Sequence, residues 1–254
     1  MILWFILFFL IIAISFVLAY QSMKDYVEKP ANLNVYSLYL IRNLQALTIA
    51  ILDEIYSALR TQDSLISFEK LFKGQKNALV VFGPKTILEK FDPQLNLLEL
   101  EDYTNVDPNI VVAWEMAIKD ASLLQNPSPI LKPNLTETEQ FWVALVLQAK
   151  KGLLSSLVSQ KKEFQVAKAR ENQKDGVKQF SGQIRAALVS DDPIRRKNLA
   201  LSLENLGEGK LVKIPRPFTS SQLLESYKSR VLQLQPTSNS LTLTAREVLA
   251  LLKI

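Results

Sequence analysis

The first part of the chain is one uncharged apolar stretch. Residues 1–23 contain no charged side chain, and Ser15 is the only clearly polar residue before Gln21. About 20 apolar residues in a helix, at a rise of roughly 1.5 Å per residue, cross the hydrocarbon core of a bilayer. The pattern therefore predicts a transmembrane anchor over residues 1–23, followed by a linker over residues 24–34.

A cleaved signal peptide is the alternative interpretation of this stretch. A signal peptide has Lys or Arg before a shorter apolar core, whereas no basic residue precedes this one, and residues 17–19 make a poor cleavage site. We therefore expect a retained single-pass anchor in the cell membrane. Lys24, Lys29 and Arg42 follow the anchor, so the positive-inside rule predicts a cytoplasmic location for the rest of the chain.

The pattern after the linker predicts alternating strands and helices over residues 35–105. Residues 35–42 are rich in β-branched and aromatic side chains and favour a strand, although a helix from here to residue 60 is an alternative. Apolar residues then recur at helical spacing between residues 46 and 60. The further predicted elements are strands at 65–72, 77–82 and 95–101, a turn at 73–76, and a short helix that opens at Gly83-Pro84 and stops at Asp92-Pro93. This βαββαβ order is that of a ferredoxin-like unit with an antiparallel sheet.

Residues 106–254 predict a second α+β unit. Strands are expected at 110–119 and 180–189, an exposed loop at 126–133, and either a strand or a helix at 139–150. Residues 152–177 are polar and basic, and favour an exposed helix or a long insert. Asp192-Pro193 predicts a helix start, with Leu199, Leu203 and Leu206 on one side and an end at Gly207. Capping boxes at Thr219/Gln222 and Thr244/Glu247 predict two more helices. The predicted fold class is therefore α+β: a transmembrane helix followed by two ferredoxin-like units.

The residue types that are absent narrow the chemistry. The chain has no Cys and no His, which excludes disulfides, thiolate nucleophiles, Ser-His triads and nearly all zinc sites. No phosphate-binding loop is present, and Gly207-Glu208-Gly209-Lys210 is better explained as a helix end and turn. We therefore predict no catalytic residue, no metal site and no cofactor, and expect that the protein is not an enzyme.

Acidic pairs are the remaining candidates for acid–base chemistry. Glu99 and Glu101 alternate with leucines and so share one face of a strand, with Asp102 next to them. Nothing else converges there, so solvated carboxylates are the simpler interpretation. Asp191 and Asp192 are explained by helix capping.

The formal net charge is +5, which is compatible with an anionic partner, although a modest excess of surface charge is the simpler interpretation. Lipid headgroups or a duplex backbone fit this pattern. A stacking platform for single strands is not indicated, because Phe164 is the only aromatic residue among the central lysines. A solvated basic face is the simpler interpretation of the cluster. The candidate contacts with an anionic partner are Lys161, Lys162, Lys168, Arg170, Lys174, Arg195, Arg196 and Lys197.

Several stretches, taken in order, resemble a known family. They are YLIRN, LISFEKLF, NALVVF, FDPQLNLLELEDY, EQFWVALVLQ, FSGQIRAALVSDDPIRRKNLALSLENL and SLTLTAREVLALL. From residue 35 onward the chain resembles the N-terminal, membrane-associated region of bacterial type IV secretion and conjugation-type DNA-transfer ATPases. The resemblance implies paired ferredoxin-like units on the cytoplasmic face of the membrane. In that family an ATP-binding motor follows this region; its phosphate loop and arginines have no counterpart here, so no catalytic residue is carried over.

The resemblance and the residue patterns lead to a first hypothesis and two alternatives. The first is a membrane-anchored scaffold that docks a translocating ATPase or secretion-channel subunits, through sheet edges or the basic insert, with homo-oligomers expected. The second is an exported, membrane-anchored envelope or binding protein with no link to a motor. The third is an enzyme that uses carboxylates or hydroxyls alone, with Glu99, Glu101 and Asp102 as its only named candidates.

Overall fold

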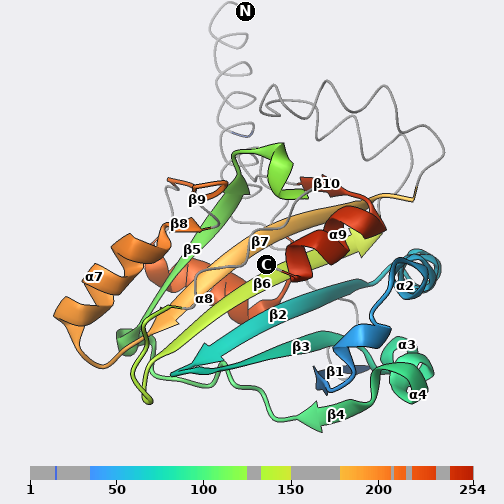
Figure 1. The fold of residues 1–254 in the computed structure, drawn as a ribbon, viewed down its shortest axis with the longest axis horizontal. Helices are drawn as coiled ribbons and strands as arrows, with labels where there is room; N and C mark the ends of the chain where they lie inside the picture. Colours follow the sequence, from blue (N-terminus) through green and yellow to red (C-terminus); the bar gives the residue numbers. More distant parts are fainter. Residues whose placement is uncertain are drawn as a thin grey trace, which may run out of the picture.

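The computed structural model describes Ser15 and residues 35–124, 133–149, 178–206, 209–215, 219–232 and 241–253. These residues form a mixed α+β structure on one large antiparallel sheet, as Figure 1 shows. The strand order is β4-β1-β3-β2-β6-β7-β5-β9-β8, and β10 pairs with β7. The strands are β1 (Tyr36–Ile41), β2 (Leu65–Lys73), β3 (Lys76–Pro84), β4 (Leu97–Leu100), β5 (Val111–Ile118), β6 (Gln140–Ala149), β7 (Phe180–Val189), β8 (Asn205–Leu206), β9 (Leu211–Lys213) and β10 (Leu241–Leu243).

The helices have local signals at their ends. The side chain of Thr48 accepts a hydrogen bond from the Ile51 amide at the start of α2, and Thr219 and Thr244 form capping boxes at the starts of α8 and α9. Such caps satisfy amides that the first helical turn leaves without a partner. The described helical segments are η2 (Leu44–Ala46), α2 (Ile49–Gln62), α3 (Lys85–Leu88), η3 (Glu89–Phe91), α4 (Asp92–Leu95), η4 (Pro108–Ile110), η5 (Ala121–Leu124), α7 (Pro193–Leu203), α8 (Ser220–Ser229) and α9 (Ala245–Leu252).

The two halves of the sheet follow the same path. We call β1, β2, β3 and β4 the first unit, and β5, β6, β7 and β9 the second unit. Counted along the chain, the strands of each unit lie in the spatial order fourth, first, third, second. The units meet at their second strands, β2 and β6, which pair from Leu65 opposite Gln148 to Lys73 opposite Gln140. An antiparallel join between equivalent strands relates the units by an approximate two-fold rotation.

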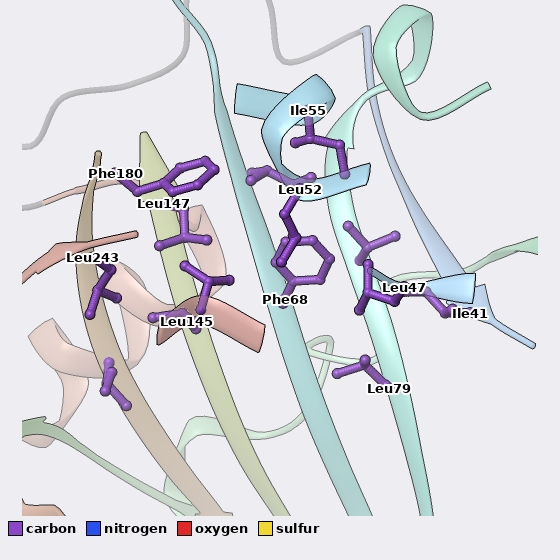
Figure 2. Close-up of a cluster of buried hydrophobic side chains, with 14 of the residues drawn as sticks. Ile41, Leu47, Leu52, Ile55, Phe68, Leu79, Leu145, Leu147, Phe180 and Leu243 are labelled. Atoms are coloured by element: carbon purple, nitrogen blue, oxygen red, sulfur yellow. The ribbon is translucent and has the colours of Figure 1, made fainter. Parts of the chain in front are cut away.

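Helices cover both faces of the central strands. Figure 2 shows Leu52 and Ile55 of α2 above Phe68 of β2, with Leu145 and Leu147 of β6 beside them. On the opposite face, Trp142 of β6 and Ala187 of β7 pack against α8, at a cluster that includes Leu223, Leu224 and Tyr227. Successive side chains of a strand point to opposite faces, so β6 and β7 need apolar residues at nearly every position. This explains why residues 139–150, ambiguous in the sequence, form a strand.

Two predicted helix ends were wrong. The helical path does not stop at Asp92-Pro93, because Pro93 lies in the first turn of α4, where a proline needs no amide partner. The turn ends instead at Asn96, which has a φ of 48°. The helix after Asp192 ends at Leu203, and Leu206 pairs with Leu211 in the β8–β9 ladder rather than extending the helix. A two-residue strand gives no periodic signal, so the sequence could not separate it from the helix.

Several predicted segments lie outside the described residues. They include the anchor at 1–23 apart from Ser15, the linker at 24–34, the loop at 126–133 apart from the buried Pro133, and the insert at 152–177. In the part of the chain that the structure describes, no helix is both long and apolar enough to span a membrane.

Candidate functional site

The sheet face beneath α8 carries a line of buried ionisable side chains. Glu69 of β2, Arg185 of β7 and Glu115 of β5 are each at most 2% exposed. Ala144 of β6 lies opposite Glu69 on one side and opposite Arg185 on the other. Glu115 is next in the line, opposite Arg185. The line therefore crosses the junction between the two units.

Arg230, the residue that ends α8, adds a second cation to this face. Its Nε donates to Glu69 Oε1 at 2.7 Å, its Nη1 donates to Asp102 Oδ2 at 2.7 Å, and its Nη2 donates to Asp102 Oδ1 at 3.0 Å. Arg230 adopts a φ of 50°, which is uncommon for a residue with a side chain. We call Glu69, Asp102 and Arg230 the interior ion cluster. It connects α8 to a strand of the first unit and to the segment that leaves β4.

Aromatic rings pack around the two buried members of the interior ion cluster, Glu69 and Arg230. The Tyr103 hydroxyl donates to Glu69 Oε2 at 2.5 Å and lies 3.1 Å from the Tyr227 hydroxyl. The Arg230 guanidinium lies 4.6 Å from the centre of the Phe82 ring and 5.6 Å from that of Tyr103. A cation over an aromatic face is stabilised by the ring quadrupole, so these rings favour the charged form of Arg230.

The ionisation states in the cluster follow from these contacts. Burial alone would raise the pKa of Asp102, but its hydrogen bonds and charge attraction to Arg230, with the Thr104 amide, lower it to about 2. Burial works against the charged form of Arg230, and the Glu69 and Asp102 carboxylates outweigh it and raise the Arg230 pKa. Burial raises the pKa of Tyr103 and of Tyr227 well above the ordinary value for tyrosine. Asp102 and Arg230 are therefore both charged at neutral pH.

Arg185 is held by backbone carbonyls as well as by its neighbours in the sheet. Its Nη1 donates to the Ser226 carbonyl at 2.5 Å, and its Nη2 donates to Gln183 Oε1 at 2.6 Å and to the Val231 carbonyl. Burial lowers the pKa of Arg185 to about 10, against the opposing charge of Glu115. Both buried arginines therefore bind the end of α8 to the sheet.

Access decides what this arrangement can do. Glu69 and Arg230 are 0% and 1% exposed, so no solute reaches their charged atoms in this conformation. Removing one partner of such a pair leaves a buried charge without compensation, which is strongly destabilising. The arrangement fits a structural role, in which the cluster sets how α8 and the segment after β4 sit on the sheet.

A second ion pair lies at the start of α7. Arg195 Nε donates to Glu139 Oε1 at 2.5 Å, and Arg195 Nη2 donates to Glu139 Oε2 at 3.0 Å. The Thr136 amide and the Ser190 hydroxyl also donate to this carboxylate. The hydrogen bonds from Arg195 are the main cause that lowers the pKa of Glu139 to about 2. Glu139 precedes β6 and Ser190 follows β7, so the pair fixes the first turn of α7 against the end of two strands.

The predicted basic contacts therefore have different surroundings. Arg195 is paired with Glu139, and Arg196 donates through Nη1 to the Ser190 carbonyl at 2.5 Å, whereas Lys197 is exposed. The other members of the predicted set lie outside the described residues; they are Lys161, Lys162, Lys168, Arg170 and Lys174.

Strand register separates the two ends of the sheet. Tyr36 lies opposite Pro84, and Ala149 lies opposite Phe180, at one end. Val189 lies opposite Gln140 at the other end, four residues before α7 begins. At about 3.3 Å per residue, the strand β7 between these ends is roughly 33 Å long. The described residues that flank the predicted insert thus lie at the β1 end, and α7 begins at the other.

The acidic candidates are also distinguished by their contacts. Glu99 is exposed and pairs with Lys85 at 3.4 Å, and Asp192 caps α7 by accepting bonds from the Ile194 and Arg195 amides. Both observations agree with the sequence interpretation. Asp102 differs, because it binds Arg230 instead of being only solvated.

Glu69 and Arg230 were missed by the sequence reasoning. One signal was available for Glu69. In LISFEKLF it shares a strand face with Leu65 and Leu71, so either the Glu69 carboxylate is buried with these leucines or the whole face is exposed to solvent. Arg230 follows a helix in the sequence and gives no comparable signal. Its partner is 161 residues away along the chain.

No cluster of three or more acidic side chains suited to a metal ion occurs among the described residues. No protein-family model matches the chain, and no curated protein matches it.

Proposed function

We propose that the protein is a membrane-anchored, non-catalytic scaffold or accessory subunit of a type IV secretion or conjugation-like system. In this role it docks a translocating ATPase or channel subunits on the cytoplasmic side of a bacterial cell membrane. The proposal treats both units as ferredoxin-like. Their shared strand order, fourth, first, third, second, supports that assignment, since a split βαβ unit with antiparallel neighbours has this order.

The observation that carries the proposal is the polarity of the sheet. The predicted anchor and linker lead into β1 at Tyr36, at the end where Pro84 and Phe180 also lie. The helix α7 begins at the opposite end, beyond Val189. A sheet attached to the membrane at one end would present α7 to soluble partners at the other. Figure 1 shows α7 at the left of the sheet and α2 and α3 at the right.

The ionisable groups support a structural role over catalysis. Three charged side chains are buried: those of Glu69, Arg185 and Arg230. Arg230 donates a hydrogen bond to Glu69, and Arg195 donates one to Glu139. A scaffold needs such internal connections to keep two units at one fixed orientation, whereas an enzyme needs charged groups that a substrate can reach.

Besides the docked proteins, we propose the membrane surface as a partner. Residues 150–177 contain seven Lys or Arg and three Asp or Glu. They join β6 to β7 at the sheet end where β1 begins, and anionic lipid headgroups attract a basic segment held near them. Nucleic acid is the weaker candidate for the same charges.

Topology is the test of the proposal. Two reporters, one active only in the cytoplasm and one active only outside it, are fused after Ile254 in the full chain. We expect activity from the cytoplasmic reporter only, and we expect deletion of residues 1–23 to move the protein from the membrane to the soluble fraction. An active external reporter would exclude docking to a cytoplasmic motor and favour an anchored envelope or binding protein.

A further inference from the structure

The helix α7 is apolar on two opposite sides. Leu203 is buried, and Leu199 and Ala200 pack against the main core, so this side attaches α7 to the sheet. Ile194 is 73% exposed and Leu201 is 56% exposed. At 100° per residue, Ile194 and Leu201 share one side of the helix, and Leu203 is on the opposite side. The outer apolar pair is therefore mostly exposed, and the buried side of α7 is the one that packs on the sheet.

The flank of α7 between the outer apolar pair and the core-facing side is hollowed. An open depression of about 440 Å³ is lined by Asp192, Ile194, Arg195, Asn198 and Leu199. Arg195 cannot move freely at its wall, because two hydrogen bonds hold its guanidinium on Glu139. The depression is large enough for side chains of another molecule, and its wall is preformed. A preformed site loses less conformational entropy on binding.

The charge on this side points to one class of occupant. We call Ile194, Lys197, Asn198 and Leu201 the outer stripe of α7. Lys197 lies midway between the two exposed apolar residues and makes no ion pair with any described residue. The positive charge of Arg195 is already compensated by Glu139. Within the part of the chain that the structure describes, the outer stripe thus presents one cation without an ion pair between two apolar contacts.

A second copy of this chain fits the outer stripe poorly. Antiparallel pairing of two α7 helices would set Ile194 of one copy against Leu201 of the other, with the symmetry axis between Lys197 and Asn198. The two Lys197 ammonium groups would then meet near the axis, and like charges at an interface are unfavourable. A partner with a carboxylate opposite Lys197 would be attracted by its positive charge instead of repelled.

We propose that the outer stripe of α7 binds an amphipathic helix of a partner protein, with two apolar residues two turns apart and an acidic residue between them. The inference rests on the proposed scaffold function for its biological setting, since it names the chemistry of what the scaffold docks. Helices recognise grooves through apolar anchors at such spacings. One helix on this stripe buries less than a standard interface, so we expect weak, reversible binding.

The test uses the full chain in nanodiscs of zwitterionic lipid and two labelled peptides, each about 15 residues long so that a helix can form. Both have leucines two turns apart on an alanine and glutamine background. One has glutamates midway between the leucines, and the other has lysines there. Binding is measured by fluorescence anisotropy, with empty nanodiscs as background.

We expect the glutamate peptide to bind at least tenfold more tightly than the lysine peptide. The double variant Ile194→Ser/Leu201→Ser should lower the affinity for the glutamate peptide at least tenfold. Lys197→Glu should make the lysine peptide the tighter binder of the two. Leu44→Ser, at a leucine that is 53% exposed elsewhere on the surface, is the matched control and should change neither affinity.

Three results would overturn the proposal. Equal affinity for the two peptides, or no binding of either, would remove the acidic helix as the occupant. A dimer in sedimentation experiments that the double variant dissociates would assign the stripe to a second copy. Binding to anionic vesicles that the double variant abolishes, with no peptide binding, would assign it to a lipid surface. None of these results depends on the reporter fusions, so the scaffold function and this inference fail separately.

Discussion

The first and second units share a strand order but differ in how their strands are connected. In the first unit, β2 turns into β3 through Gly74 and Gln75, and Gly74 has a φ of 53° that suits glycine. In the second, the equivalent strands β6 and β7 are joined by residues 150–179. The pairing is nonetheless continuous up to Ala149 opposite Phe180. The strand order therefore does not depend on a short connection at this position.

The helices also differ between the units. The long helix α2 connects β1 to β2, whereas the described helical segment after β5 is the short η5. The C-terminal helix α9 contacts both η5 and α2 and so supplies cover on that face. A helix from a distant part of the chain can thus serve the second unit as α2 serves the first. The sheet is stable when its apolar face is covered, whichever part of the chain supplies the covering helix.

The outer edges of the units complete the comparison. The edge of β9 is paired with β8, while β4 pairs only with β1 among the described strands. The strand β4 is short, carries the charged Glu99, and has its Leu97 amide bound by the Asp92 side chain at 2.7 Å. Short length and charge protect an edge against unwanted pairing. The two edges are therefore closed by different means.

The largest expected effect comes from breaking the link between the units and α8. Arg230→Met should lower the free energy of unfolding by about 3–5 kcal/mol, because Glu69 would stay buried without a compensating charge. Denaturant unfolding of the full chain in detergent, followed by tryptophan fluorescence, to which Trp142 beside Tyr227 contributes, measures the change. The double variant Glu69→Leu/Arg230→Met should recover most of the loss. Glu225→Gln, at an exposed position of α8, is the control. A loss below about 1 kcal/mol would mean that the cluster does not hold α8 to the first unit.

A smaller effect should come from the ion pair at α7, which only the second unit possesses. Glu139→Gln should lower the free energy of unfolding at pH 7 by about 1–3 kcal/mol, since the amide cannot match the charge of Arg195. The pKa of Glu139 is about 2 in the folded chain and 4.5 ordinarily, so its contribution is present above about pH 4.5. It is lost as the pH falls from about 4.5 toward about 2.

Denaturation curves of the wild type and Glu139→Gln at several pH values test this sign. The difference in stability between the two proteins should shrink as the pH falls through that window. A difference that stays constant with pH would show that the carboxylate charge does not contribute. Glu99→Gln, at the exposed pair with Lys85, is the control and should behave like the wild type.

The smallest effect should come from making the second hairpin resemble the first. Replacing residues 150–177 by Asn-Gly shortens the connection from thirty residues to four, keeping Lys178, whose Nζ donates to Ser57 Oγ of α2 at 3.0 Å. Loop-closure entropy falls by about 0.6 kcal/mol for each halving, so stability should rise by about 1–2 kcal/mol. Thermal unfolding measures it. A fall in stability would show that the replaced residues contribute packing, and that the hairpins are not interchangeable.

Much of the local structure was predictable, because its signals lie within a few residues. The strand at 180–189 was predicted with the bounds that β7 has, and the capping boxes at Thr219 and Thr244 form as expected. The mixed α+β class with antiparallel strands was also correct. By contrast, β8, β9 and β10 have two or three residues each and were missed, since so short a strand shows no alternation.

In the candidate site, too, contacts between residues close in sequence were predictable and contacts between distant residues were not. Asp192 was recognised as a cap because its partners, the Ile194 and Arg195 amides, follow it directly. Neither the pairing of β2 with β6 nor that of Glu69 with Arg230 could be derived from residue patterns. Strand edges present the same backbone groups whatever their side chains, and a salt bridge across 161 residues leaves no periodic trace. These contacts arise only when the folded chain brings distant segments together, where burial makes one pairing far more favourable than the others.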